Sequence, residues 1–221
     1  MIRLCIFDLD GTTVNSLRSI AHFANETLEV FGLEPFPVDD YRTLAGGGAR
    51  KLISNLINSR RADPLLLDAM IEDWLSRYEK NAFYLTDPYE GITDMLTELK
   101  AMNVVTAIVT NKSQRVAESI INHSFGPRGK LIDIAISEHP GMVLKPEPDE
   151  ILNLCRKFNI PPENTMYIGD HTIDMTTGKN AGVKCCGVIW GFHSAESLIN
   201  AGADFIAKVP GDIVKYINNN I

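Results

Sequence analysis

Six short, unbroken runs of apolar residues constrain the fold of this chain more than any other feature. They lie at residues 2–7, 104–110, 132–137, 165–170, 185–190 and, more weakly, 203–208. Each run has the length of a β-strand but lacks the apolar–polar alternation of a half-exposed strand. Such runs are typical of strands buried on both faces, as in a parallel sheet covered by helices.

Helical patterns separate these runs in the later part of the chain. Residues 92–102, 113–125 and 149–159 each place apolar side chains at helical spacing on one face. Strand and helix therefore alternate from about residue 87 to the end. This alternation predicts a doubly wound, Rossmann-like α/β core with a parallel sheet.

Residues 14–86 break the rhythm, because they contain helical patterns and no convincing strand. One of these patterns ends at Gly32, a common helix stop, and another is interrupted by glycines 46–48. We expect an all-helical insert over 14–86 and an α/β core formed by 1–13 and 87–221. A helical N-terminal half without a separate domain is the alternative, but the first strand precedes the helices and favours an insert.

The composition is that of an ordinary globular protein, with 45% hydrophobic and 22% charged residues among 221. The net charge of −7 argues against nucleic acid or an anionic membrane as the main partner. The four cysteines lack CxxC spacing, which favours buried thiols in a reducing compartment. No signal peptide and no apolar run of bilayer-crossing length are evident, so we expect a cytoplasmic protein.

Polar residues follow four of the predicted strands at the point where each ends. They are Asp8, Asp10, Thr110, Asn111, Lys145, Asp170 and Asp174. Ligands of parallel α/β sheets bind outside the carboxyl ends of the strands. We therefore expect these carboxylates, the hydroxyl and the ammonium to meet in one crevice.

Several carboxylates in one crevice repel one another, and a divalent cation would relieve that repulsion. Oxygen ligands with few histidines favour Mg²⁺ over Zn²⁺. Beside such a cation, Asp8 could be an ionised nucleophile while Asp10 carries a proton. Thr110 is expected where a helix begins, and helix N-termini bind phosphate. Lys145 would neutralise charge on a transferring phosphoryl group.

Four motifs formed by these residues resemble those of the haloacid dehalogenase-like phosphohydrolase superfamily. They are DLDGT, TN, KP and GDHTID, in that order along the chain. The resemblance covers almost the whole chain, and the four motifs together are far more specific than any one of them. The helical insert and the segments 45–53 and 188–192 look like the phosphoglycolate phosphatase-like branch, which has a small helical cap.

The resemblance implies a role for each acidic residue. Asp8 would attack phosphorus and form an aspartyl-phosphate. Asp10 would protonate the leaving alcohol and then activate the water that hydrolyses this intermediate. Mg²⁺ would be held by Asp8, the backbone carbonyl of Asp10 and Asp170. Asp174 would be a further ligand or would hold a metal-bound water.

The resemblance also implies phosphoryl contacts from Thr110 and the Asn111 backbone N–H, with Lys145 neutralising the phosphoryl oxygens. Taken singly, such residues have ordinary explanations, such as a helix cap at Thr110, but together they favour catalysis. In the insert, Gly47 and Arg50 could belong to a loop that closes over the site and reads the substrate. The alternative is a flexible connection with Arg50 in solvent.

The expected function is a Mg²⁺-dependent phosphatase acting on a small phosphorylated metabolite, for which 2-phosphoglycolate is the first candidate from the cap resemblance. A phosphosugar mutase or a phosphonate hydrolase of the same superfamily is an alternative, as is a non-catalytic phosphate-binding protein. A phosphonate hydrolase would need a lysine from the insert, where only Lys51 and Lys80 occur. The protein is expected to be a monomer or a homodimer.

Overall fold

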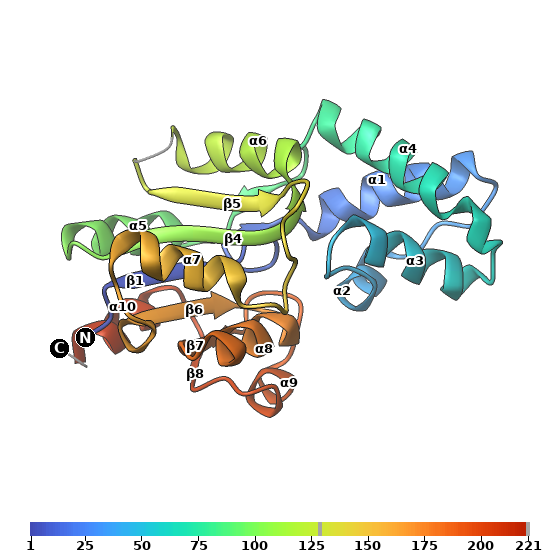
Figure 1. Ribbon diagram of the computed structural model, residues 1–221. Helices are drawn as coiled ribbons and strands as arrows, with labels where there is room; N and C mark the ends of the chain where they lie inside the picture. Colours follow the sequence, from blue (N-terminus) through green and yellow to red (C-terminus); the bar gives the residue numbers. More distant parts are fainter. Residues whose placement is uncertain (128–129, 220–221) are drawn as a thin grey trace.

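A six-stranded parallel sheet forms the centre of the computed structural model, which describes residues 1–127 and 130–219 (Figure 1). The strand order is β5-β4-β1-β6-β7-β8. These strands are β1 (Leu4–Phe7), β4 (Val105–Ser113), β5 (Ile134–Glu138), β6 (Thr165–Gly169), β7 (Lys184–Val188) and β8 (Phe205–Ala207). Each predicted apolar run forms one of them, and the doubly wound α/β fold is confirmed.

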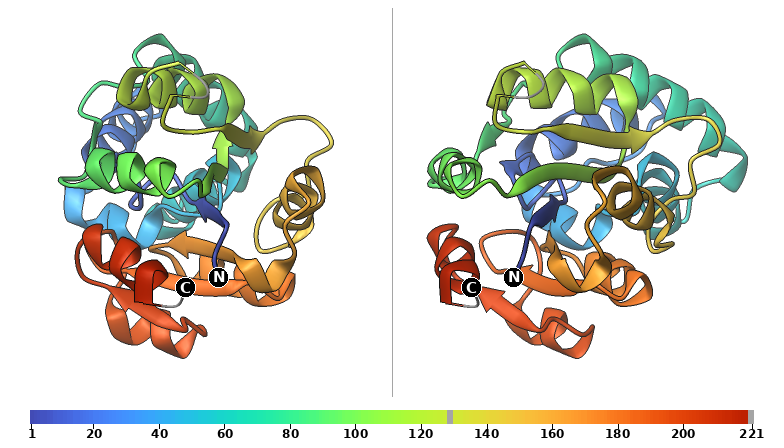
Figure 2. Two further views of the ribbon diagram at one scale, coloured as in Figure 1. Left: turned by 90° about the vertical axis from the view of Figure 1, so that its left-hand side faces the viewer. Right: turned by 60° about the vertical axis from the view of Figure 1, so that its left-hand side comes forward.

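Side chains that alternate along the strands are buried on both faces of the sheet. Leu4 and Ile6 of β1 pack in one cluster, whereas Cys5 and Phe7 pack in another. The first cluster includes residues of α7 (Asp149–Phe158) and α8 (Thr172–Ala181), and the second includes residues of α5 (Ile92–Ala101), α6 (Gln114–Phe125) and α10 (Gly211–Asn219). Figure 2 shows α5 and α10 across the sheet from α7. Burial on both faces explains why the runs do not alternate with polar residues.

Helices from residues 17–80 lie beyond the end of the sheet toward which the strand arrows point (Figure 1). They are α1 (Leu17–Val30), α2 (Tyr41–Leu44), α3 (Ala49–Arg60) and α4 (Leu67–Lys80). One apolar cluster runs from these helices into the sheet. A separate cap domain over 14–86 therefore stays a prediction. No helix within the described ranges has the length and apolarity needed to cross a bilayer.

The chain enters and leaves these helices through a small antiparallel pair. It is formed by β2 (Val14–Asn15) and β3 (Asp87–Pro88). The prediction that 14–86 contains no strand is wrong at this point, because two residues are too few to show a strand pattern in sequence. The remaining elements are α9 (Ala195–Asn200) and the 3₁₀ turns Val38–Asp40, Pro64–Leu66 and Pro162–Asn164.

Candidate active site

Three carboxylates meet at the carboxyl ends of two central strands. Asp8 follows β1, Asp170 follows the neighbouring β6, and Asp174 lies in the first turn of α8. One carboxylate oxygen from each lies within 4.8 Å of the others. The sheet order thus joins residues that are far apart in sequence, as predicted for the ends of parallel strands.

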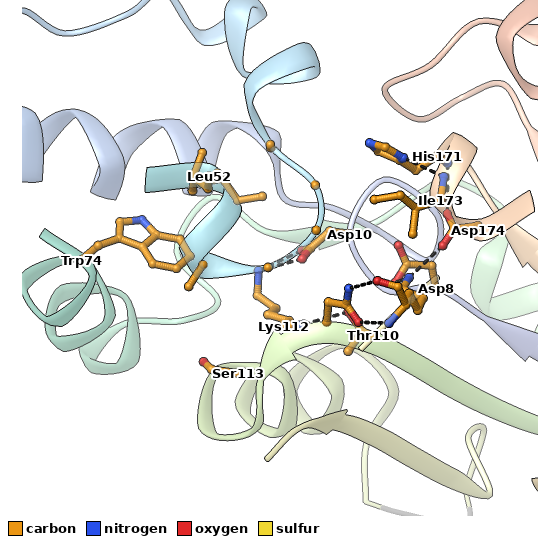
Figure 3. A pocket seen from close by; sticks show the side chains of 18 residues that line it. Asp8, Asp10, Leu52, Trp74, Thr110, Lys112, Ser113, His171, Ile173 and Asp174 are labelled. Carbon is orange, nitrogen blue, oxygen red and sulfur yellow. Dashed lines mark hydrogen bonds and ion pairs between the residues drawn. The ribbon is translucent and has the colours of Figure 1, made fainter. Parts of the chain in front are cut away.

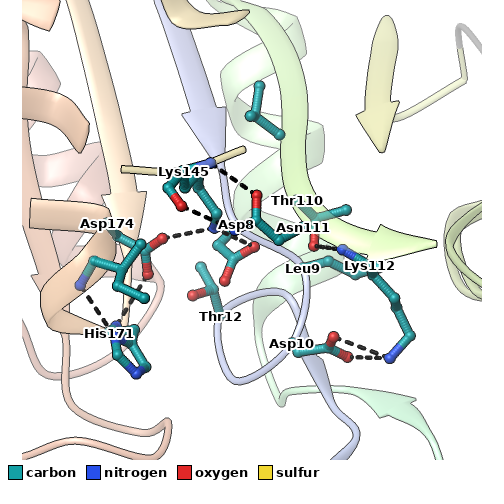
Figure 4. Close-up of polar contacts among 12 residues, drawn as sticks. Asp8, Leu9, Asp10, Thr12, Thr110, Asn111, Lys112, Lys145, His171 and Asp174 are labelled. Carbon is teal, nitrogen blue, oxygen red and sulfur yellow. Dashed lines mark hydrogen bonds and ion pairs between the residues drawn. The ribbon is translucent and has the colours of Figure 1, made fainter. Parts of the chain in front are cut away.

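A buried lysine lies between two of these carboxylates (Figure 4). The Lys145 Nζ is 2.9 Å from Asp8 Oδ1 and 2.7 Å from Asp174 Oδ1. Burial disfavours its charged form, but the charges of Asp174 and Asp8 raise the pKa of Lys145 well above its usual value. Lys145 is therefore an ammonium ion at the centre of the site.

The Asn111 side chain fixes the backbone of Lys145. Its Nδ2 donates to the Lys145 carbonyl at 3.2 Å, and its Oδ1 accepts from the Lys145 N–H at 2.9 Å. This bidentate contact gives Asn111 a positioning role in addition to the phosphoryl contact predicted for its backbone.

The clustered carboxylates are unfavourable as charged groups. Burial raises the pKa of Asp8 to about 7; Lys145 opposes that shift, and Asp174 adds to it. Burial also raises the pKa of Asp170 well above its usual value, with further contributions from Asp174 and Asp8. A divalent cation would stabilise all three as carboxylates, and an all-oxygen donor set suits a hard cation such as Mg²⁺. The residues therefore fit the metal that the sequence predicts.

Asp170 lies in a cradle too tight for additional side-chain atoms. Its Oδ1 accepts from Thr12 Oγ1 at 2.9 Å, and its Oδ2 accepts from the Phe192 N–H at 2.8 Å. A Cβ at Gly11 would lie 2.3 Å from Asp170 Oδ2, and a Cβ at Gly191 would lie 2.5 Å from the same atom. The glycine of DLDGT is thus required by the close approach of this carboxylate.

Asp10 faces away from the acidic group and is paired with Lys112. The Lys112 Nζ lies 2.9 Å from both carboxylate oxygens, and Ser16 Oγ donates to Oδ1 at 2.5 Å. Sequence analysis predicted that the backbone carbonyl of Asp10 binds the metal. The Asp10 side chain is instead bound by Lys112 and Ser16. Sequence analysis assigned no site role to Lys112.

Thr110 lies within β4, and not at the start of a helix as predicted. The strand continues to Ser113, and α6 begins at Gln114. The polar end of β4 pairs with β5 through Thr110 beside Ser137 and Ser113 beside Glu138, with a register shift between these two pairs. Thr110 still lines the cavity, but without the helix N-terminus that supported its predicted role.

A cavity of about 80 Å³ lies between these residues and the helices of the insert (Figure 3). Its polar side is formed by residues of the core: Asp8, Asp10, Thr110, Asn111, Lys112, Ser113, Lys145, His171 and Asp174. The insert contributes mainly apolar side chains and glycines: Ile20, Ala45, Gly46, Gly47, Gly48, Ala49, Leu52 and Trp74. The charged side chains that line the cavity therefore all come from the core.

The glycine loop and Arg50 differ in their relation to the cavity. Gly47 lines it, as expected of a loop that closes over the site, and Gly46 approaches the core so closely that a Cβ would lie 2.6 Å from His171 Nε2. Arg50 is not among the lining residues, and its exposed guanidinium lies 2.6 Å from Asp68. The structure thus has Arg50 in solvent, which is the alternative considered from the sequence, and a substrate contact of Arg50 stays a prediction.

Two curated relatives resemble the chain over nearly its full length. A phosphoglycolate phosphatase of Aquifex aeolicus is 29% identical over 100% of this chain and 99% of its own. An N-acetylmuramic acid 6-phosphate phosphatase of Pseudomonas aeruginosa is 26% identical over 98% of this chain and 95% of its own. The two relatives are named for substrates of very different size.

Solved structures share the fold at lower sequence identity. A protein from Lactobacillus delbrueckii subsp. bulgaricus has a TM-score of 0.89 and 24% identity, covering 97% of this chain and 98% of its own. CbbY from Rhodobacter sphaeroides, in complex with phosphate, has a TM-score of 0.79 and 23% identity, covering 96% of each chain.

The family model described as haloacid dehalogenase-like hydrolase matches residues 5–188, from β1 through β7. This span includes all four motifs and the helices between the first and the second. The chain belongs to the haloacid dehalogenase-like hydrolases.

Proposed function

We propose that the protein is a Mg²⁺-dependent phosphomonoesterase that works through an aspartyl-phosphate on Asp8. Asp8 supports this function most directly, because its carboxylate opens into the cavity beside Lys145 and within reach of Asp170 and Asp174. Mg²⁺, held by Asp8, Asp170 and the Asp10 carbonyl, with Asp174 as a ligand or behind a metal-bound water, would supply a Lewis acid for the phosphoryl oxygens.

The chain's own residues would divide the remaining work. Asp8 Oδ would attack phosphorus while the ester P–O bond breaks, and Asp10 would give its proton to the leaving oxygen. Asp10 would then take a proton from the water that cleaves the acyl-phosphate. Lys145 and Thr110 would hold the phosphoryl oxygens in place.

The small cavity supports a small substrate, and 2-phosphoglycolate is the first candidate. The Aquifex relative, named phosphoglycolate phosphatase, supports this choice. The insert would act as a cap that limits access and excludes water. The Pseudomonas relative, named for N-acetylmuramic acid 6-phosphate, supplies the larger substrate against which the choice is tested.

The alternatives receive less support from the site. The cavity-lining residues of the insert include neither Lys51 nor Lys80, so no lysine of the insert is available there for a phosphonate hydrolase. A phosphosugar mutase would use the same core residues but return an isomerised ester. A non-catalytic binding protein would have no need for the arrangement of Asp8, Lys145 and the acidic group.

The test is release of inorganic phosphate from 2-phosphoglycolate, N-acetylmuramic acid 6-phosphate, a hexose phosphate and p-nitrophenyl phosphate, with Mg²⁺ or with EDTA. We expect Mg²⁺-dependent release, strongest with 2-phosphoglycolate. Isomerisation without release would indicate a mutase, and the absence of both reactions from the folded protein would overturn the proposal.

A further inference from the structure

Lys112 is a buried cation to which the proposed reaction assigns no task. Only 5% of its side chain is exposed, at the end of β4 inside the cavity. Burial disfavours its charge, but Asp10 and Tyr78 raise the pKa of Lys112 above its usual value. A buried ammonium ion has lost its hydration, so it is stable only if opposite charges and hydrogen-bond acceptors surround it.

The partners of Lys112 come from two separate parts of the chain. Its Nζ donates to both oxygens of Asp10 at 2.9 Å and to Tyr78 Oη at 2.9 Å. The same ammonium lies 4.4 Å from the centre of the Tyr78 ring. Tyr78 is fully buried in α4 of the insert, so Lys112 joins the DLDGT loop to the insert through one charged group.

These contacts fix the direction in which the Asp10 carboxylate points. Ser16 Oγ donates to Oδ1, and the Lys112 ammonium donates to both oxygens. Asp8 is held by a different lysine, Lys145, at 2.9 Å. Separate lysines thus keep the two carboxylates apart within one cavity, as their different tasks require.

We propose that Lys112 is a positioning residue, which orients the Asp10 carboxylate toward the leaving-group oxygen and is itself held in place by Tyr78. The proposal rests on the phosphatase function given above. Lys112 transfers no proton. Asp10 must start as the carboxylic acid: it gives its proton to the departing oxygen, becomes the carboxylate that Lys112 and Ser16 stabilise by hydrogen bonds, and later regains a proton from water.

Leaving groups of different basicity test this role. An alkoxide needs a proton as the P–O bond breaks, whereas p-nitrophenolate leaves without one. The ratio kcat/KM includes steps only up to the departure of the leaving group. Loss of Asp10 orientation should therefore lower kcat/KM for an alkyl phosphomonoester but hardly change it for p-nitrophenyl phosphate.

The variants are Lys112→Met, Lys112→Arg and Tyr78→Phe, compared with Asp10→Asn. We expect Lys112→Met to lower kcat/KM about 10²-fold for the alkyl ester and far less for the aryl ester. Lys112→Arg should recover part of the alkyl activity, and Tyr78→Phe should show the selective loss in weaker form. Adding Lys112→Met to Asp10→Asn should bring no further selective loss, because both act on one group.

Equal losses on both esters, or a selective loss that adds fully to that of Asp10→Asn, would overturn the proposal. If Lys112→Met does not fold, Tyr78→Phe decides in the same way, since it removes one hydroxyl and keeps the ring. Absence of phosphate release by the wild-type protein would instead count against the proposed function.

Discussion

Asp8 and Asp10 are separated by a single residue, yet their carboxylates are paired with different buried lysines. Asp8 lies 2.9 Å from Lys145, and Asp10 lies 2.9 Å from Lys112. Their mutual repulsion is thereby reduced, and each carboxylate is directed to its own part of the cavity. Asp8 belongs with Asp170 and Asp174, which could hold a metal ion, and Asp10 lies on the side that faces the insert.

Replacement of the proposed nucleophile, Asp8, tests the reaction class. Asp8→Asn should reduce phosphate release by roughly 10⁴-fold or more, because an amide does not form the acyl-phosphate. The variant should remain folded, since Lys145 keeps its contact with Asp174. Acid quenching followed by intact-mass measurement should detect a phosphoenzyme only in the wild type. Asp68→Asn, at an exposed site, is the matched control.

The Asp170 cradle predicts a metal-binding defect from one added methyl group. In Gly191→Ala the Cβ would lie 2.3 Å from the Gly11 carbonyl oxygen and 2.5 Å from Asp170 Oδ2, which must displace the loop. We expect Mg²⁺ affinity to fall about 10- to 100-fold in calorimetric titration. Gly211→Ala is the control, because nothing lies within 4 Å of its Cβ. Unchanged Mg²⁺ affinity in Gly191→Ala would contradict the cradle.

The size of the cavity predicts how selectivity responds to a larger side chain. Ala49 lines the cavity at the start of α3, so Ala49→Leu should narrow the space for the leaving group. The value of kcat/KM for a hexose phosphate should fall at least about tenfold more than that for 2-phosphoglycolate. Ser59→Leu places the same side chain on an exposed position of α3 and should leave the ratio unchanged.

The outward position of Arg50 predicts that its removal has little effect. Arg50→Ala breaks only an exposed ion pair with Asp68, which contributes at most about 1 kcal/mol to the free energy of unfolding. We expect kcat/KM to stay within about twofold of the wild-type value. A large rise in KM would show that the insert adopts a different position when substrate binds.

The lowered pKa of Asp133, which lies outside the cavity, predicts that the free energy of unfolding decreases in acid. Burial opposes its charge, but hydrogen bonds from Lys100 and Thr106 lower the pKa of Asp133 below its usual 3.8. The unfolded chain then binds more protons, so this contribution is present above pH 3.8 and lost as pH falls through the folded value. Asp133→Asn should cost about 1–2 kcal/mol in urea unfolding at neutral pH and less in acid.

The fold was predictable because a strand that is buried on both faces of a sheet appears in the sequence as an unbroken run of apolar residues. The unbroken apolar runs correspond to β1, β4, β5, β6, β7 and β8. The convergence of Asp8 and Asp170 followed from strand direction, since parallel strands end at one edge, whereas Lys145 lies in a loop that Asn111 fixes. Their catalytic roles remain predictions until the variants are measured.

The parts that sequence analysis missed depend on contacts between distant segments. Nothing near Lys112 in sequence indicates that Tyr78 will accept its hydrogen bond or that Asp10 will share its charge. The direction of Arg50 depends on how the glycine loop sets the orientation of α3, where Gly46, Gly47 and Gly48 all have positive φ. Helical periodicity predicts a helix but not its rotation toward a distant cavity.

The strand order also determines when, during synthesis, the residues of the active site can first come together. Strand β1 is translated before both of its neighbours in the sheet, β4 and β6, which follow it by about 100 and 160 residues. Until Asp170 and Asp174 have been added, the nascent polypeptide carries Asp8 on a strand with an unfilled edge and without its acidic partners. Activity should therefore begin only late in translation, and a message truncated before α8 should encode no hydrolase.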